Sequence, residues 1–319
     1  MTIELACIAD GGYLRHTGAM LHSALAHSPG ERFSVCVLHG NPIPEQERAK
    51  LQQVTQAFGA RLRFELVDDQ RAAQFPCGYF PRAVWLRILL PELLPQAERV
   101  LYLDSDLIVT GDLAPLWATD LGDHLLAAVT NPFYPFMPDH PRLHLGIKDP
   151  RDYFNSGVLL MNLARMRAEG TSSRLCEFAR TRPGNPYPDQ DALNEVCRGR
   201  WLHLHPRWNV QSTLFELAPA QLPLPPQQVA EALAQPALVH YIGPFKPWHY
   251  LCRHPLQALY FEHARATPWG APALEGQTPR NAVLRRLPLA WIDRWFRLER
   301  LAGRAWRRLR PGEPAITVR

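Results

Sequence analysis

Apolar residues in the first part of the chain follow two alternating spacings. Runs of strand length lie at residues 3–9, 33–38 and 62–66, and between them residues 16–28 and 44–58 carry apolar side chains three or four positions apart. Pro44 and Gly59 flank the second helical segment, and they are typical of the first turn and the end of a helix. Strands that alternate with helices in this way predict an α/β fold with a mostly parallel sheet.

The alternation continues along the rest of the chain. Residues 80–94 have a helical pattern in spite of Pro81 and Pro91. Further strands are predicted at 100–103, 125–130, 157–161, 201–204 and 237–242, and further helices at 189–197 and 256–266. The proline-rich segment 132–150 is a candidate lid or substrate-contacting loop. We therefore expect a single Rossmann-like, mostly parallel mixed sheet flanked by helices.

A pair of aspartates follows the buried strand predicted at 100–103. Side chains two positions apart on an extended backbone point to the same side, so the carboxylates of Asp104 and Asp106 should converge. Two close carboxylates repel each other unless they are hydrated, protonated or bridged by a cation, and a hard divalent ion is the usual bridge. The alternative is an ordinary Asp-x-Asp at the exit of a strand, and the motif by itself leaves both interpretations open.

Composition places the chain among globular proteins. The 319 residues are 46% hydrophobic, which is ample for a substantial core. The first ten residues include Glu4 and show no basic segment followed by a long apolar one, and no run of eighteen apolar residues occurs. The expected location is therefore the cytosol. The six cysteines are scattered without a C-x-x-C pair, and we interpret them as reduced core thiols.

Charge is concentrated at the C-terminal end. Residues 280–319 contain eleven arginines, no lysine and three acidic residues, a net charge of +8, so that residues 1–279 carry −3 of the total of +5. The basic charge lies on one segment beside tryptophans, and this does not favour binding of nucleic acid. Residues 287–309 carry apolar side chains three or four positions apart with arginines between them. We interpret 280–319 as a basic amphipathic tail that binds an anionic membrane surface through residues 285–310. The alternative is a docked helix with a solvated basic face.

A second polar cluster follows the strand predicted at 237–242. His240 ends this strand, Gly243 and Pro244 turn the chain, and Lys246 follows. The chain has three lysines and thirty-two arginines, and a lysine in so arginine-rich a chain indicates a need for a compact charge, as at a phosphate. A lone histidine is more often structural. His240 becomes a plausible third metal ligand because its segment and that of Asp104 both end strands of what should be one sheet.

Several other polar residues lie between apolar ones. Asn155 and Gln190 can each donate and accept hydrogen bonds, as binding of sugar hydroxyls requires. The alternatives are a strand-entry role for Asn155 and a helix N-cap for Asp189. Arg87 precedes the central strand and could face phosphates. Gly11 and Gly12 would let the backbone approach a ligand and Tyr13 could stack on a base, although a tight strand-to-helix turn would also use two glycines.

Taken together, these motifs resemble the retaining glycosyltransferases of family 8. The matching segments, in family order, are 9–13, 85–87, 100–106, 153–157, 189–191 and 240–249. The resemblance implies a GT-A fold for residues 1–270, a donor that is usually a UDP-sugar, and a Mn²⁺ or Mg²⁺ ion held by Asp104, Asp106 and His240.

The resemblance also implies roles for single residues. The residues that would contact the donor are Asp10, Tyr13, Arg87, Asp104, Ser105, Gly243 and Lys246. Of these, Asp10 would bind the uracil and Tyr13 would stack on it, and Gly243 and Lys246 would bind the diphosphate. The residues that would surround the transferred sugar and take part in catalysis are Arg87, Asn155, Asp189 and Gln190. Two positions depart from the bacterial galactosyltransferases of the family, Gly12 where they often have Asn and Asn131 where they have Asp near the acceptor. These departures bear on the acceptor more than on the donor.

The function expected from this resemblance is transfer of a hexose from a UDP-sugar to a lipid-linked glycan such as a lipopolysaccharide core. Galactose is the favoured hexose, and glucose is the alternative. The enzyme would then work as a peripheral protein at the inner face of the cytoplasmic membrane. Retention of configuration requires either a covalent intermediate or attack from the face of departure, and we favour the second because Gln190 is uncharged. Two alternatives remain: a phosphohydrolase of the haloacid dehalogenase type, whose nucleophile loop Asp104-Ser105-Asp106 resembles, and a non-catalytic module that binds nucleotide sugars or lipid surfaces.

Overall fold

The computed structural model describes residues 1–67, 75–76, 81–133, 141–182 and 184–287. The chain divides into two compact units, one formed by Met1–Pro247 and His254–Pro272 and the other by Trp248–Arg253 and Ala273–Arg319. The amphipathic helix predicted for the tail falls almost entirely beyond Leu287, outside the described residues.

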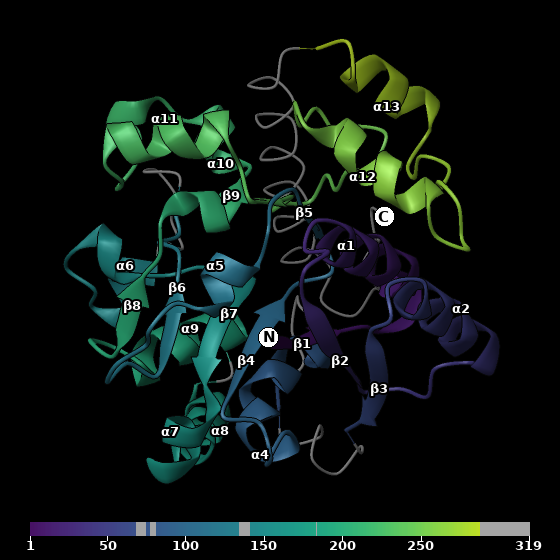
Figure 1. Ribbon diagram of the computed structural model, residues 1–319. Helices are drawn as coiled ribbons and strands as arrows, with labels where there is room; N and C mark the ends of the chain where they lie inside the picture. Colours follow the sequence, from purple (N-terminus) through teal and green to yellow (C-terminus); the bar gives the residue numbers. More distant parts are fainter. Residues whose placement is uncertain (68–74, 77–80, 134–140, 183, 288–319) are drawn as a thin grey trace, which may run out of the picture. The chain divides into compact units, whose positions relative to one another are not determined.

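The first unit is built on a seven-stranded sheet with the order β3-β2-β1-β4-β7-β6-β8 (Figure 1). Its strands are β1 (Thr2–Ile8), β2 (Arg32–His39), β3 (Arg61–Leu66), β4 (Arg99–Leu103), β6 (Leu126–Ala128), β7 (Val158–Asn162) and β8 (Trp201–His203). Among the described strands of this sheet, only β7 runs antiparallel to its neighbours, which are β4 and β6. The predicted α/β fold with a mostly parallel mixed sheet is confirmed.

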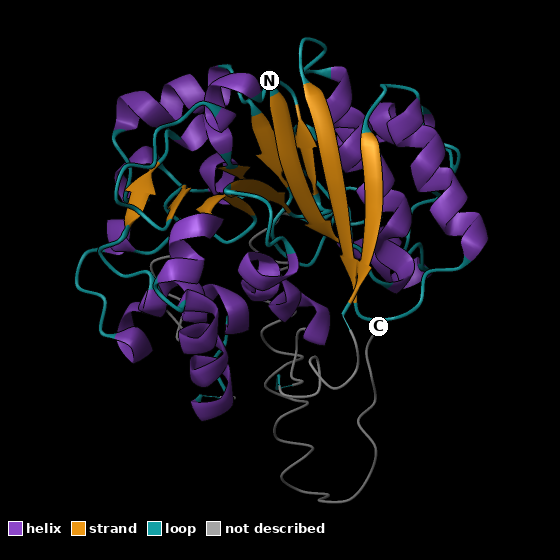
Figure 2. Ribbon diagram, turned by 60° about the horizontal axis from the view of Figure 1, so that its bottom comes forward, coloured by secondary structure: helices purple, strands orange, loops and turns teal. Residues whose placement is uncertain are grey.

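Helices cover both faces of this sheet, because alternate side chains of its buried strands are apolar on each face (Figure 2). On β4, Val100 and Tyr102 belong to one core cluster and Leu101 and Leu103 to another. The first cluster includes residues of η2 (Arg82–Leu89), α4 (Leu90–Leu93), α7 (Leu163–Ala168), α8 (Thr171–Thr181) and α9 (Pro188–Val196). The second includes residues of α1 (Leu14–Ala26), α2 (Glu45–Gln56) and α5 (Ala114–Trp117).

The segment before β4 is not the continuous helix that its periodicity predicts. Arg82–Leu89 form a 3-10 helix, and a single α-helical turn, Leu90–Leu93, follows it. Pro91 contributes to this break, since it has no N–H to donate to a carbonyl in the preceding turn. The 3-10 helix nevertheless carries Arg87, which is 5% exposed, into the interior beside the end of β4.

A second sheet of three strands contains His240. Its order is β5 (Leu107–Val109), β10 (Leu238–His240) and β9 (Val210–Gln211). β10 runs antiparallel to β5 and parallel to β9. The expectation that the segments of His240 and Asp104 end strands of one sheet was therefore wrong. The chain leaves the large sheet at the turn after β4, and β5, which the sequence did not reveal, pairs with β10 instead.

The remaining elements of the first unit are short apart from two helices. The α-helices are α6 (Pro141–Leu145), α10 (Thr213–Glu216), α11 (Pro226–Ala234) and α12 (Gln257–Arg265), and the 3-10 turns are η1 (Gly11–Tyr13), η3 (Pro150–Asp152), η4 (Pro206–Trp208) and η5 (Pro219–Gln221). Helix α12, which the sequence predicted, packs against α1 through the pairs Tyr260–His16 and His263–His22.

The second unit contains α13 (Pro279–Leu284), whose N-cap Thr278 accepts a hydrogen bond from Asn281 N. Arg253 donates to the carbonyl of Leu284 (3.3 Å) and so ties this helix to the segment Trp248–Arg253.

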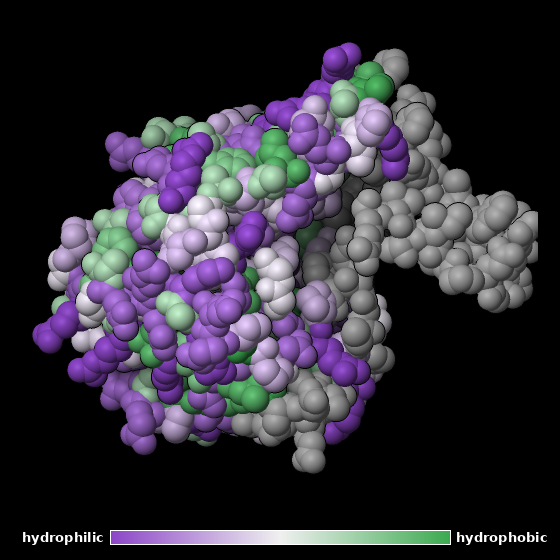
Figure 3. Space-filling model, turned by 90° about the vertical axis from the view of Figure 1, so that its right-hand side faces the viewer, coloured by the Kyte–Doolittle hydropathy of each residue, from purple (hydrophilic) through white to green (hydrophobic). Residues whose placement is uncertain are grey.

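Three further features concern the surface, the cysteines and the length of the helices. On the face seen in Figure 3, hydrophilic residues predominate and hydrophobic ones are scattered among them. The five cysteines within the described ranges are free, as the sequence predicted. Among the described residues no helix combines the length and the apolarity needed to cross a lipid bilayer.

Candidate active site

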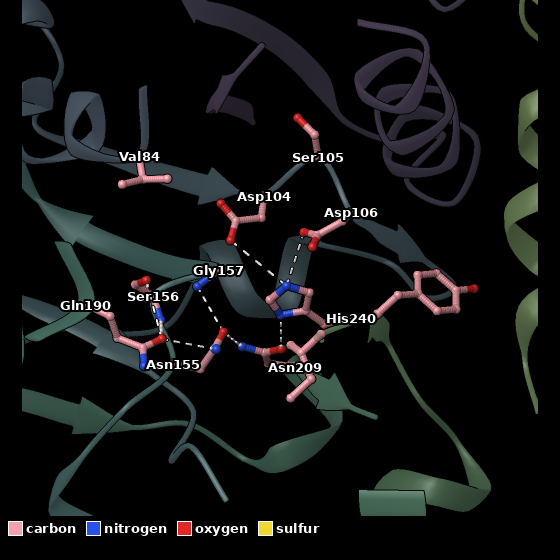
Figure 4. Close-up of polar contacts among 12 residues, drawn as sticks. Val84, Asp104, Ser105, Asp106, Asn155, Ser156, Gly157, Gln190, Asn209 and His240 are labelled. Atoms are coloured by element: carbon pink, nitrogen blue, oxygen red, sulfur yellow. Dashed lines mark hydrogen bonds and ion pairs between the residues drawn. The ribbon is translucent and has the colours of Figure 1, made fainter. Parts of the chain in front are cut away.

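Three side chains of types that can bind a metal ion converge beyond the end of β4. Asp104, Asp106 and His240 each offer one ligand atom, and these atoms lie within 4.8 Å of one another, the one group of this kind found in the described part of the chain (Figure 4). His240 Nε2 lies 3.2 Å from Asp106 Oδ1 and 3.9 Å from Asp104 Oδ2. The predicted triad is thus brought together, although its histidine comes from the second sheet.

Backbone hydrogen bonds hold these three residues in register. Asp104 N donates to Gly157 O (2.8 Å), which continues the β4–β7 pairing into the site. Tyr241 N donates to Asp106 O (3.0 Å), which continues the β5–β10 pairing. The turn Asp104-Ser105-Asp106 therefore joins the two sheets, and each sheet fixes one of the carboxylates.

Two cations balance the paired carboxylates. Arg87 Nη2 lies 3.0 Å from Asp104 Oδ1, and Lys246 Nζ donates to Asp106 Oδ2 (2.5 Å) and to Tyr241 O (2.8 Å). Burial alone would raise the pKa of Asp106, but the charge of Lys246 and the close contact with His240 lower it well below its usual range. Asp106 is therefore held as a carboxylate, the form that binds a cation.

Arg87 connects the carboxylates to helix α9. Its Nε lies 3.1 Å from Asp189 Oδ2, and its Nη1 donates to Ser156 O (2.8 Å). Burial would lower the pKa of Arg87, but Asp104 and Asp189 raise it above its usual value, so the guanidinium stays charged. Burial raises the pKa of Asp189, although Arg87 acts in the opposite direction.

Gln190 and Asn155 form the next part of the same network. Gln190 Oε1 accepts from Ser156 N (3.0 Å) and from Asn155 Nδ2 (3.2 Å), and Gln190 Nε2 donates to the hydroxyl of Tyr153 (3.0 Å). Asn155 Nδ2 also lies 3.3 Å from Asn131 Oδ1. The four residues predicted for the sugar and the chemistry, Arg87, Asn155, Asp189 and Gln190, are thus joined in one buried network.

The residues predicted for the nucleotide follow three strands: β1 and β4, which are neighbours in the large sheet, and β10 of the second sheet. Asp10 accepts hydrogen bonds from Asn41 Nδ2 (3.0 Å to each oxygen), and the ring of Tyr13 is 41% exposed. Gly243 has a positive φ of 92° and so permits the turn that leads from β10 to Lys246. Ser105 points inward, and its hydroxyl donates to Ile8 O (2.7 Å) and lies 2.8 Å from Thr17 Oγ1.

Comparison with known proteins identifies the family. The sequence profile of "Glycosyl transferase family 8" matches residues 4–252, well over half of the chain. The chain belongs to glycosyltransferase family 8. The fold is accordingly the GT-A fold, and the resemblance seen in the sequence is confirmed.

Several known proteins are similar to this family 8 chain. General stress protein A of Bacillus subtilis is 30% identical over 284 residues, which cover 85% of this chain and 97% of that protein. Lipopolysaccharide glucosyltransferase WaaO of Escherichia coli is 25% identical over 290 residues, covering 86% and 81%. The crystal structure of galactosyltransferase LgtC with donor and acceptor sugar analogs superposes with a TM-score of 0.73 at 28% identity, covering 89% of this chain and all of that one.

The structure of this family 8 protein adds site residues for which the sequence gave no role. Tyr153 donates its hydroxyl to Asp191 Oδ1 (2.7 Å), and Asp191 Oδ2 lies 2.9 Å from His144 Nε2. Asn209, which is completely buried, lies between His240 and Asn155. Tyr153 and Asp191 are the end residues of segments 153–157 and 189–191, which the sequence did reveal. Asn209 lies in a segment without periodicity, and no local signal marks it.

Proposed function

We propose that the protein is a metal-dependent retaining glycosyltransferase that moves a hexose from a UDP-sugar to the glycan of a lipid-linked acceptor, a lipopolysaccharide or lipooligosaccharide core. The observation that carries the proposal is the convergence of Asp104, Asp106 and His240, which Arg87 joins to Asp189 on α9. A set of possible metal ligands beside a buried polar network suits transfer of a sugar from a nucleotide. Membership of family 8 favours this function over that of a phosphohydrolase.

The donor set fits a hard divalent ion. Two carboxylates and one imidazole, with ligand atoms within 4.8 Å of one another, suit Mn²⁺ or Mg²⁺. When bound, such an ion would supply positive charge to neutralise the departing diphosphate. Lys246, which lies beside Asp106, would supply further charge to that diphosphate, and Gly243 would allow its backbone to approach it.

The remaining donor contacts follow from position. Asp10 would bind the uracil and Tyr13 would stack on it, since Tyr13 offers an exposed ring at the end of β1. Ser105 would hold the turn Asp104-Ser105-Asp106 in place beside the donor, because its hydroxyl donates to the carbonyl of Ile8 at the end of β1. Asn155, Asp189, Gln190 and Arg87 would surround the transferred sugar.

Transfer from the face of departure agrees with the orientation of these groups. The carbonyl oxygen of Gln190 already accepts two hydrogen bonds, and Asp189 is paired with Arg87. Both are thereby held by protein donors, which favours a positioning role over a nucleophilic one. The proton of the acceptor hydroxyl would pass to the departing phosphate oxygen as the new glycosidic bond forms.

Donor sugar and acceptor are proposed from the relatives. LgtC is named a galactosyltransferase and WaaO a lipopolysaccharide glucosyltransferase. We favour galactose because LgtC covers more of the chain at higher identity, and a lipopolysaccharide core because WaaO is named for that acceptor. Asn131 and the segment 132–150 would contact the acceptor. The basic segment 285–310 would hold the enzyme at the anionic inner face of the cytoplasmic membrane.

Release of UDP tests the proposal. With Mn²⁺ and truncated lipooligosaccharide, UDP-galactose should give UDP and a lengthened glycan, UDP-glucose should react more slowly, and excess EDTA should stop the reaction. Asp104→Asn and Asp106→Asn should each lower the rate at least about 100-fold, whereas Asp120→Asn, on an exposed turn, should not. Full turnover in EDTA would refute metal dependence. Release of inorganic phosphate from a simple ester would indicate a hydrolase, and UDP binding without turnover a binding module.

A further inference from the structure

Asn209 lies on the side of His240 that faces away from the paired carboxylates (Figure 4). It is completely buried and follows η4, directly before β9. Its amide contacts two residues of the site. Asn209 Oδ1 lies 3.0 Å from His240 Nδ1, and Asn209 Nδ2 donates to Asn155 Oδ1 (2.9 Å).

Backbone N–H groups fix the direction of the hydrogen bonds that link Gln190, Asn155, Asn209 and His240. Gly157 N donates to Asn155 Oδ1 (2.9 Å), and since a backbone N–H can only donate, this atom of Asn155 must be its oxygen. Ser156 N fixes Gln190 Oε1 in the same way, and that oxygen accepts from Asn155 Nδ2. Asn209 must therefore turn its NH₂ group to Asn155 Oδ1, and its own oxygen is left facing His240.

This orientation determines the tautomer of His240. A carbonyl oxygen against Nδ1 requires a proton on Nδ1, so in the neutral ring the lone pair lies on Nε2. Nε2 is the nitrogen that faces Asp106 (3.2 Å) and Asp104 (3.9 Å). The ring is thus set to offer its lone pair on the side of the two carboxylates.

We infer that Asn209 is a positioning residue that sets the tautomer of His240 for cation binding and couples it, through Asn155, to Gln190. The inference rests on the metal site of the proposed function. Partners of this kind, hydrogen-bonded to the second nitrogen of a ligating histidine, change metal affinity about 10- to 100-fold without touching the ion. In this chain the partner also joins the metal side of the site to the sugar side.

Two substitutions of Asn209 separate its two hydrogen bonds. Asn209→Asp keeps an oxygen against His240 Nδ1 and loses the donor to Asn155, whereas Asn209→Leu removes both at similar volume. The matched control is Gln211→Leu, which removes a completely buried amide from the adjoining strand β9, where its Nε2 donates to Thr130 O. We expect Mn²⁺ affinity, measured with saturating UDP from the electron spin resonance of free Mn²⁺, to fall about 10- to 100-fold in Asn209→Leu and to stay near the native value in Asn209→Asp and Gln211→Leu.

The tautomer itself can be read without metal or any variant of Asn209. In protein with ¹⁵N-labelled histidine, long-range ¹H–¹⁵N correlation spectra show which ring nitrogens of His240 carry a proton. The signals of His240 are those that disappear in His240→Gln. We expect a proton on Nδ1 in the native protein and a shift toward Nε2–H in Asn209→Leu. An Nδ1 without a proton in the native protein, or an unchanged Mn²⁺ affinity in folded Asn209→Leu, would overturn the inference.

These measurements need neither donor sugar nor acceptor. If the native protein transfers no sugar but shows His240 protonated at Nδ1, the proposed function fails and the inference stands. If it transfers sugar while Nδ1 of His240 carries no proton, the inference alone fails.

Discussion

Gly157 lies directly against the imidazole of His240. A Cβ atom at Gly157 would lie 2.2 Å from His240 Cε1 and 2.9 Å from both His240 Nδ1 and Asp104 Oδ2. Non-bonded atoms do not approach a Cβ atom so closely, so any side chain at this position must displace the ring or the carboxylate. The glycine at the start of β7 is therefore required by space, because its φ is not in the left-handed region.

Gly157→Ala should consequently damage the metal site. Displacement of the ring by about 1 Å should lower the transfer rate about 100-fold, and overpacking should cost about 1–3 kcal/mol in the free energy of unfolding. UDP release and urea denaturation measure the two effects. Gly30→Ala is the matched control, since a Cβ there has no heavy atom within 4 Å. Native activity in Gly157→Ala would mean that His240 does not belong to the working site.

Lys246→Ala should weaken the binding of UDP. A charge-assisted contact to phosphate contributes about 1.5–3 kcal/mol, so the dissociation constant measured by calorimetry with Mn²⁺ should rise about 10- to 100-fold. The control is Lys50→Ala, which removes a lysine paired with Glu47 at 2.7 Å on α2. If UDP affinity were the same in Lys246→Ala, the ammonium would serve only to balance Asp106.

Stability should fall in mild acid through the histidines between α1 and α12. Burial lowers the pKa of His263 to about 4, and His22 and His27 act in the same direction. In the unfolded chain the pKa is about 6.5. The unfolded chain therefore binds a proton between these values and the native protein does not, so this contribution to stability is complete above about pH 6.5 and declines as the pH falls toward 4.

His263→Asn should reduce that pH dependence, since asparagine can still bond His22 but does not take up a proton. Between about pH 7 and 5 the loss in the free energy of unfolding should be smaller than in the native protein by up to about 2 kcal/mol. Chemical denaturation at the two pH values measures it, and His205→Asn, at a surface pair with Glu231, serves as the control. Parallel pH profiles for His263→Asn and the native protein would contradict the assignment.

Membrane binding should depend on the arginines of the tail. In the full chain, substitution of Arg297, Arg300 and Arg304 by Gln should weaken sedimentation with anionic liposomes at low salt about 100-fold, since each basic residue near such a surface contributes about 1 kcal/mol. UDP release in detergent should not change. Three exposed arginines of β2 and β3, Arg32, Arg61 and Arg63, provide the matched control. Equal effects of both sets, or no binding by the native chain, would show that the segment does not bind membranes.

The local pattern of apolar and polar residues was sufficient to predict most elements of the large sheet and its helices, and also the convergence of Asp104 and Asp106. The strands β1, β2, β3 and β4 and the helices α1, α2, α9 and α12 were predicted within a few residues, because each buries a regular apolar face that leaves its period in the sequence. The period of two on β4 also placed Asp104 and Asp106 on one side, and these two carboxylates do converge in the structure.

Tertiary structure decided what pairs with these elements. Strands β5 and β9 have only three and two residues, too few to show a period. Their pairing with β10, which the sequence did predict, takes His240 out of the large sheet and brings it to Asp106 from another direction. Arg87 lies in a 3-10 segment, where helical spacing does not give the direction of the side chain, and only the packed structure sets it between Asp104 and Asp189. Asn209 has no period and no motif around it. Its role follows from two hydrogen bonds across more than thirty residues of sequence, to His240 (31 apart) and Asn155 (54 apart), and such contacts leave no mark on local sequence.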